Sequence, residues 1–159
     1  MTASAPELST LLSVDAIRIG ASAADWRAAI REAGDALVSS GATTDAYTDE
    51  MIAAVEELGP YIVIAPGIAL AHSRPSPAVI RAGMSLVTLA EPVTFGHSRN
   101  DPVRLVVGLA APDEDGHVTA LSTLAEFLAD EGRQQELLSA ETADDVARMV
   151  RGFERGDHS

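Results

Sequence analysis

The sequence predicts an α/β fold in which a mixed β-sheet lies between helices on both faces, a three-layer sandwich. Short apolar, β-branched runs occur between segments with helical spacing, without the regular strand–helix–strand repeat of an all-parallel sheet. The length of 159 residues suits one domain able to bury a large core. We therefore expect one domain over residues 1–159, with its core at about 11–151 and a flexible tail at 152–159.

The first part of the chain is predicted to form a helical turn, a strand and a helix. Residues 8–12 suit one helical turn, and residues 16–19 alternate like a half-buried strand. Ser22 can cap the following helix, with Asp25 in the position of a capping-box acid. Gly41 is expected to end that helix.

The remaining elements follow from periodicity and from turn residues. A second helix is expected from Thr44 or Asp45 to Leu58, where Gly59-Pro60 stops it. Strands are expected at 61–72 (broken at Pro66-Gly67), 83–89 and 103–110. Helices are expected at 117–128, 131–138 and 142–151. Residues 95–102, rich in turn formers, are expected to be a loop.

Composition excludes several classes of protein. The chain has no cysteine, which rules out disulfides, thiolate metal sites and cysteine nucleophiles and agrees with a cytoplasmic location. A formal charge of −13, with the arginines scattered, disfavours binding to nucleic acid or anionic lipid. No window reaches the roughly 18 apolar residues of a membrane span, and no signal peptide is recognisable. We therefore expect a soluble protein without direct membrane insertion.

The stretch Tyr61–Pro75, YIVIAPGIALAHSRP, carries a single histidine, His72, at the end of an apolar run. The unperturbed pKa of histidine, about 6.5, leaves much of the imidazole neutral and nucleophilic near neutral pH. A strand end would hold such a group in a steady position. An isolated histidine here would more often merely end a strand, so a second group must support a chemical role.

His117 is the second histidine with an informative setting, because it opens a helix after the acidic segment Asp113–Gly116. The free backbone N–H groups and the positive dipole end of a helix start suit an anion. Taken alone, a first-turn histidine is more often plain helix surface. The other two histidines, His97 and His158, lie in a loop and in the tail.

Other chemistries are disfavoured by missing motifs. The spacing of His72, His97 and His117 matches no compact metal signature, although a zinc-dependent hydrolase assembled by the tertiary fold stays open. The chain has no G-x-S-x-G elbow, no lysine and no phosphate-binding P-loop. Any phosphoryl chemistry must therefore use a donor other than ATP held in such a loop.

Residues 64–75, IAPGIALAHSRP, resemble the phosphorylation motif of the type 2 enzyme IIA domains of the bacterial phosphoenolpyruvate-dependent sugar phosphotransferase system. The family usually places an acidic or amide residue where this chain has Glu57, fifteen positions ahead of His72. Residues 100–111, NDPVRLVVGLAA, resemble a later family segment that leads to a second active-site histidine, here His117. The resemblance runs from about Leu11 to Val150 and implies the same sandwich fold.

The resemblance implies that His72 accepts a phosphoryl group from the carrier HPr and passes it to a cognate enzyme IIB, itself linked to a membrane enzyme IIC. His117 and nearby backbone N–H groups would hold the phosphoryl oxygens, with no metal and no cofactor. The small residues around the nucleophile would let the partner's histidine approach; they are Gly67, Ala69, Ala71 and Ser73.

Three positions depart from the commoner pattern. Ala71 stands where most members have proline, Ser73 replaces the usual small residue after the histidine, and Glu56 stands where the mannitol and fructose branches have an arginine. Arg74, two residues after the nucleophile, could supply the missing charge, and the motif looks most like that of the ascorbate-type branch. The alternative function is a regulatory phosphohistidine module that binds a transcription factor or kinase without serving a transporter. A dimer is compatible with the sequence, which does not determine the oligomeric state.

Overall fold

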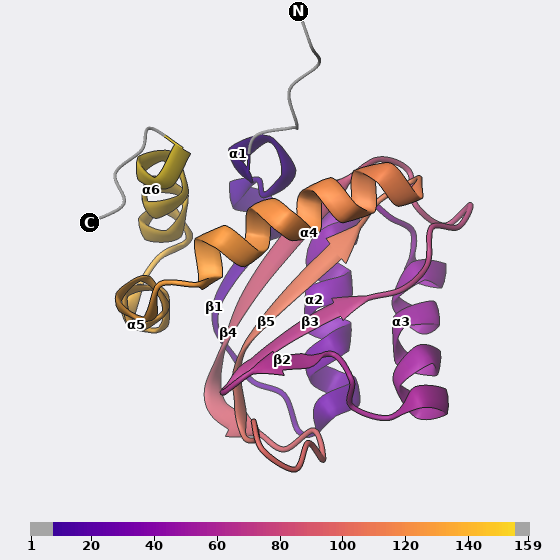
Figure 1. Ribbon diagram of the computed structural model, residues 1–159, viewed down its shortest axis with the longest axis horizontal. Coiled ribbons are helices and arrows are strands. Elements are labelled where there is room, and N and C mark those ends of the chain that lie inside the picture. Colours follow the sequence, from indigo (N-terminus) through magenta and orange to yellow (C-terminus); the bar gives the residue numbers. More distant parts are fainter. Residues whose placement is uncertain (1–7, 155–159) are drawn as a thin grey trace, which may run out of the picture.

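The computed structural model describes residues 8–154 and consists of a five-stranded sheet with helices on both faces (Figure 1). The strand order is β1-β4-β5-β3-β2, in which β1 and β4 pair in parallel, as do β3 and β5, while the other neighbours are antiparallel. The strands are β1 (Ile17–Ala21), β2 (Val63–Ala65), β3 (Ile68–His72), β4 (Gly83–Val93) and β5 (Val103–Ala110). The predicted three-layer sandwich with a mixed sheet is confirmed.

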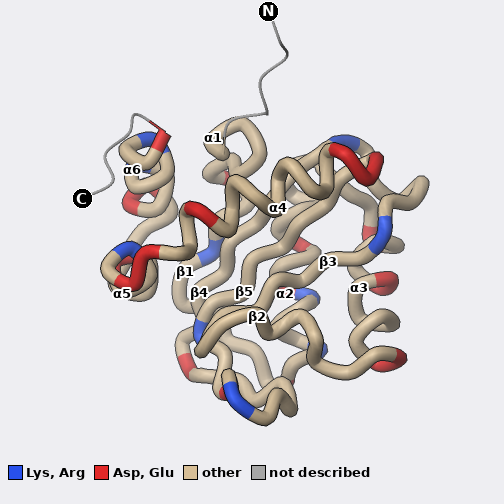
Figure 2. The backbone as a smooth tube through the Cα atoms, in the orientation of Figure 1, with Lys and Arg blue, Asp and Glu red and all other residues tan. Residues whose placement is uncertain are grey.

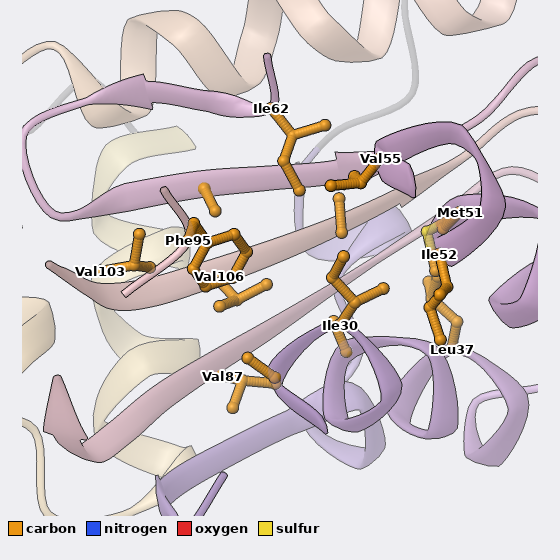
Figure 3. Packing of buried hydrophobic residues seen from close by; sticks show 14 of the residues in the cluster. Ile30, Leu37, Met51, Ile52, Val55, Ile62, Val87, Phe95, Val103 and Val106 are labelled. Carbon is orange, nitrogen blue, oxygen red and sulfur yellow. The ribbon is translucent and has the colours of Figure 1, made fainter. Parts of the chain in front are cut away.

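Two helices, α2 (Trp26–Ser39) and α3 (Asp45–Leu58), cover one face of the sheet. Each turns an apolar stripe inward, and Figure 3 shows side chains from both helices meeting those of the strands in one buried cluster. The labelled members are Ile30, Leu37, Met51, Ile52, Val55, Ile62, Val87, Phe95, Val103 and Val106. This layer holds α3 beside the end of β3, where the site described below is found.

The opposite face is covered by α1 (Leu8–Leu11), α4 (Glu114–Leu128), α5 (Glu131–Ser139) and α6 (Ala143–Glu154). The helix α4 crosses in front of the sheet in Figure 1. It comes directly after β5 in the sequence and begins close to the end of that strand. Its buried residues Leu124 and Phe127 belong to the same apolar cluster as Leu70 and Leu109 of the strands. A second core thus fixes α4 on this face.

The strand β3 is buried on both faces, and its side chains alternate between the two cores. Ala69 and Ala71 belong to the α2–α3 core, whereas Ile68 and Leu70 belong to the α4 core. Because successive strand residues point to opposite faces, the next residue, His72, falls on the α4 side. In the register of the sheet it lies opposite Leu109 of β5.

The start of α2 differs from the sequence-based expectation. The N-cap of α2 is Asp25, whose carboxylate accepts a hydrogen bond from Ala28 N (2.9 Å), so the predicted cap at Ser22 is wrong. A single acidic side chain before the first turn is sufficient to satisfy a free N–H. The predicted break at Pro66-Gly67 is confirmed as a turn that joins two antiparallel strands, with Gly67 at φ +78°.

The end of the chain differs as well, because α6 continues to Glu154, beyond the predicted end at 151. Residues 155–159, including His158, lie outside the described residues, so the expectation of a flexible tail is untested there. Within residues 8–154, no helix has the length and apolar content needed to cross a bilayer.

Candidate active site

A cleft of about 730 Å³ opens at the carboxyl end of β3, between α3, the loop after β3 and the first turn of α4. His72 and His117 both line it, although 45 positions separate them in the sequence. Arg74 and Glu57, two further residues singled out in the sequence, also line it. The fold therefore brings together the predicted nucleophile, its predicted partner and the candidate charge.

The imidazole of His72 is held by its own strand, because Nδ1 lies 2.8 Å from the carbonyl oxygen of Leu70. A carbonyl oxygen only accepts, so Nδ1 carries the proton and donates it, and Nε2 keeps its lone pair. Burial lowers the pKa of His72 below 6.5, and the nearby His117 lowers it further, while the bond to Leu70 opposes the shift. The result is a half-buried, neutral imidazole with one nucleophilic nitrogen.

His117 lies in the first turn of α4, where Asp113 caps the helix by accepting a hydrogen bond from Gly116 N (2.6 Å). Its ring centroid is 5.6 Å from that of His72, with 53° between the ring planes. Its Nδ1 is buried and has no hydrogen-bond partner within residues 8–154. Unsatisfied buried polar atoms are rare in folded proteins, so this nitrogen has unused hydrogen-bonding capacity beside the cleft.

Tyr61 and Arg74 form the outer wall on the other side of His72. The ring of Tyr61 meets that of His72 edge to face, with centroids 5.6 Å apart and an interplanar angle of 81°. Burial raises the pKa of Tyr61, and the charge of Arg74 partly offsets the shift. Arg74 is exposed at the mouth of the cleft and forms no ion pair with any residue from 8 to 154.

Tyr47, on the buried face of α3, is a residue of this site that the sequence pattern did not single out. Its hydroxyl donates to the carbonyl of Leu109 (2.7 Å) and accepts from the backbone N–H of Ser73 (3.0 Å). Leu109 lies opposite His72 in the sheet, and Ser73 follows His72 along the chain. One buried hydroxyl therefore bonds to the residues on two sides of His72. Burial raises the pKa of Tyr47 to about 12, which keeps the hydroxyl protonated. Its hydroxyl on an otherwise apolar helix face was the available signal.

Carboxylates surround the rest of the cleft, and Figure 2 shows acidic residues along α3 and at the start of α4. Glu50 accepts a hydrogen bond from Ser76 Oγ (2.7 Å) and thereby fastens the loop after β3 to α3. Glu57 and Glu114 complete the acidic rim. Glu56 is ion-paired with Arg27 (2.9 Å), so it is engaged on the surface of α2 and α3.

His97 lies in the loop before β5, at the opposite end of the sheet from His72. Its Nδ1 accepts the backbone N–H groups of Arg99 and Asn100, both at 3.1 Å. The tertiary assembly of His72, His97 and His117 required by a zinc hydrolase is therefore not formed. Within residues 8–154, no cluster of three or more histidine, aspartate or glutamate side chains could hold a metal ion.

The expectation that small residues open the strand to a partner is wrong for three of the four positions. Ala69 and Ala71 are fully buried against α2 and α3, and Gly67 lies in the turn at the other end of β3. Their small size serves the close packing of the sheet core. Only Ser73 lines the cleft.

Comparisons with known proteins extend over almost the whole chain. Residues 10–152 match the family model described as phosphoenolpyruvate-dependent sugar phosphotransferase system, EIIA 2. The mannitol-specific cryptic phosphotransferase enzyme IIA component of Escherichia coli K12 is 32% identical over 143 residues, or 90% of this chain and 97% of that protein. The ascorbate-specific PTS system EIIA component of the same strain is 35% identical over 135 residues, or 84% of this chain and 88% of that protein.

Solved structures agree with this similarity. The solution structure of the mannitol-specific cryptic enzyme IIA from Escherichia coli has a TM-score of 0.81 at 31% identity and covers 91% of this chain and 98% of its own. The mannitol enzyme IIA in an Escherichia coli complex with phosphorylated enzyme IIB has a TM-score of 0.76 at 29% identity, covering 87% of this chain and 95% of its own.

Proposed function

The chain belongs to the EIIA type 2 family of the phosphoenolpyruvate-dependent sugar phosphotransferase system, and from this premise we propose that His72 is its phosphoryl-accepting residue. The observation that carries the proposal is the hydrogen bond from His72 Nδ1 to Leu70 O (2.8 Å), which leaves Nε2 as the free nucleophile. The lowered pKa of His72 keeps this nitrogen unprotonated at neutral pH.

Phosphoryl transfer to His72 requires no general base. The Nε2 lone pair of His72 attacks phosphorus in line, an N–P bond forms, and the N–P bond of the donor phosphohistidine breaks with its electron pair returning to the donor nitrogen. Nε2 has no proton to lose, because the ring proton is on Nδ1. Onward transfer is the same step in reverse, with an acceptor residue attacking phosphorus and His72 leaving.

His117 and Arg74 are proposed to stabilise the transferred group. The ring of His117 lines the same cleft with its centroid 5.6 Å from that of His72, and its Nδ1 has no hydrogen-bond partner within residues 8–154. Arg74 brings a positive charge without an ion pair to the same cleft. Preorganised donors of this kind are usually the largest contribution to phosphoryl transfer, because there is little covalent work for the protein to do.

The partners follow from the place of an EIIA component between two other phosphocarriers. We propose that phosphorylated HPr is the donor and an enzyme IIB the acceptor, with the exchange taking place in the cytoplasm. The acceptor is supported by the mannitol enzyme IIA, whose structure in complex with phosphorylated enzyme IIB resembles this chain. The open mouth of the cleft, beside exposed Arg74 and Tyr61, gives a partner's side chain access to His72.

The proposed specificity is ascorbate-type, in a transport role. An ascorbate-specific relative is 35% identical and a mannitol-specific one 32%. The support for the ascorbate type is the resemblance of the motif itself, with Ala71 before His72 and Arg74 after it. The test compares phosphoryl transfer from the labelled protein to ascorbate-type and mannitol-type enzyme IIB. Faster transfer to the mannitol-type acceptor would overturn the proposed ascorbate specificity.

The transport role has its own test in the neighbouring genes. The absence of genes for an enzyme IIB and an enzyme IIC beside this one would favour the regulatory alternative.

The deciding experiment is labelling with phosphoenolpyruvate, enzyme I and HPr. The wild type should acquire an acid-labile, base-stable phosphate, and His72→Ala should acquire none. His97→Ala is the matched control, since it removes a histidine from the far end of the sheet, and it should label normally. Labelling of His72→Ala would refute the site. Arg74→Ala belongs in the same assay, and unchanged transfer kinetics would show that Arg74 supplies no charge.

A further inference from the structure

A second cleft, of about 360 Å³, lies at the opposite end of β3 from His72. It is formed by the turn between β2 and β3, the end of the loop before β5, and α5. Arg99 and Arg104 line it together with the exposed amide of Gln135. Apolar residues line the cleft between these groups; they include Pro66, Ile68, Leu105 and Leu138.

The two arginines are uncompensated, in a chain whose formal charge is −13. Ion pairs occupy Arg18, Arg27, Arg31 and Arg148. Within residues 8–154, by contrast, the guanidinium groups of Arg99 and Arg104 have neither an ion pair nor a hydrogen bond. The carboxylate in the same cleft, Asp101, does not neutralise them by contact, since its two oxygens accept the backbone N–H groups of Phe95, Gly96 and His97 at 2.7 to 2.9 Å.

The base of this cleft is rigid. Gly67 N donates to Asn100 O (2.9 Å), and Arg104 N donates to Gly67 O (2.8 Å). The side chain of Asn100 also donates to Val63 O (3.3 Å). These bonds join the turn, the loop and β5, so the positions from which Arg99 and Arg104 extend are set before any ligand arrives. Preorganised donors lose less entropy on binding than mobile ones.

We infer that this cleft binds a small phosphate monoester, with its phosphate between Arg99 and Arg104 and its organic part against the apolar walls. Guanidinium groups match the geometry of a phosphate and can bond it in a bidentate manner. The cleft lies in the volume range of small-molecule sites and is larger than a bare phosphate requires. The site is separate from the cleft at His72, so it stands or falls independently of the proposed function.

The test is a residue-resolved NMR titration of the ¹⁵N-labelled chain with inorganic phosphate and, separately, glycerol 3-phosphate at constant ionic strength. Saturable shifts are expected at the amides of Gly67, Asn100, Arg104 and Gln135, with tighter binding of the ester. Shifts confined to residues 73 and 116–118 would place the anion in the other cleft and overturn the inference. So would a linear, non-saturating response, and equal affinity for the two probes would overturn the claim for an ester.

Arg99→Gln with Arg104→Gln should weaken the binding of glycerol 3-phosphate about tenfold or more, since two charge-assisted contacts are lost. Arg148→Gln with Arg151→Gln is the matched control, because it makes the same change in net charge on α6. The control should bind like the wild type. Equal weakening in both double variants would mean that only overall charge attracts the anion, which would refute the site. Dispersed amide spectra of all variants verify that they are folded.

Discussion

Two histidines lie at opposite ends of the sheet, and their Nδ1 atoms take opposite parts in hydrogen bonding. Nδ1 of His72 donates to the carbonyl of Leu70, whereas Nδ1 of His97 accepts the backbone N–H groups of Arg99 and Asn100. The neutral ring of His72 therefore keeps a free lone pair on Nε2. The neutral ring of His97 has its lone pair engaged and its proton on Nε2. The direction of the hydrogen bond, more than the residue type, distinguishes the proposed nucleophile, His72, from His97.

The polar groups around the two rings also differ in whether their hydrogen-bonding capacity is used. The ring beside His72 belongs to His117, whose Nδ1 is buried without a partner in residues 8–154, so this end of the sheet has unused hydrogen-bonding capacity. At the other end, Asp101 and His97 together accept five backbone N–H groups of their own loop. The unused Nδ1 beside His72 marks a ring pair able to receive a group, whereas the engaged Nδ1 of His97 holds the backbone of its own loop.

After the complete loss of labelling expected for His72→Ala, the largest effect is expected from His117→Ala. The variant should still accept phosphate on His72, but onward transfer to enzyme IIB should slow by about 10²-fold, the usual effect of removing one preorganised donor. Rapid-quench kinetics of the two half-reactions measure this separately. His117→Asn, which retains an amide donor, should recover part of the rate. Wild-type rates for both half-reactions in the alanine variant would show that His117 stabilises nothing.

A smaller loss is expected from Tyr47→Phe, which leaves the N–H of Ser73 and the carbonyl of Leu109 without their partner. The free energy of unfolding should fall by about 1–3 kcal/mol, the cost of unsatisfied buried groups. The transfer rate should fall about tenfold, because the strand end that carries His72 is less well positioned. Urea denaturation and transfer assays measure the two effects. Tyr61→Phe is the control, since it keeps its edge contact with His72. A change in stability with an unchanged rate would make Tyr47 purely structural.

His97→Ala should affect only stability. Removing the acceptor of two backbone N–H groups in a partly exposed loop should cost about 0.5–1.5 kcal/mol in the free energy of unfolding. His97→Asn, whose side-chain oxygen can accept instead, should restore most of it. Thermal denaturation measures both variants. Phosphoryl transfer should be the same as in the wild type, and a slowed transfer would contradict the division of roles between the two histidines.

The pH dependence of the wild-type protein tests the protonation state of the His72 ring. Because burial lowers the pKa of His72 below 6.5, phosphoryl acceptance should stay constant from pH 8 to about 6.5 and decline only at lower pH. In that acidic window the unfolded chain binds a proton more readily than the native state, so stability should also decrease as the pH falls. Transfer rates and urea denaturation across this range measure both. A decline that begins above pH 7 would contradict the shift.

The tautomers give the finest test of the comparison. Long-range ¹H–¹⁵N spectra at pH 7.5 should show the proton on Nδ1 in His72 and on Nε2 in His97. The same tautomer at both sites would remove the basis for calling one ring a nucleophile and the other structural. The chain has four histidines, so His97→Asn assigns the pattern of His97 by its disappearance and His72→Ala assigns that of His72 in the same way.

Much of the local structure could be predicted from the residues. Apolar spacing placed α2, α3 and the strands within a few positions, since periodicity depends on side chains only a few residues apart. The cap of α2 was misassigned to Ser22 because Asp25 is as good an acceptor, and only the backbone geometry chooses between them. The role assigned to Ala69 and Ala71 was wrong because small size signals close packing as readily as access.

The sequence by itself determined the mixed α/β fold, the absence of thiol chemistry, and a histidine at the end of an apolar strand. These depend on composition and on short-range pattern. Only the tertiary structure decided that His72 faces α4, that His117 lies 5.6 Å away across the cleft, and that Tyr47 joins Ser73 to Leu109. Strand register and helix docking arise from many weak contacts between distant segments, and no short window of the chain contains both partners of such a contact.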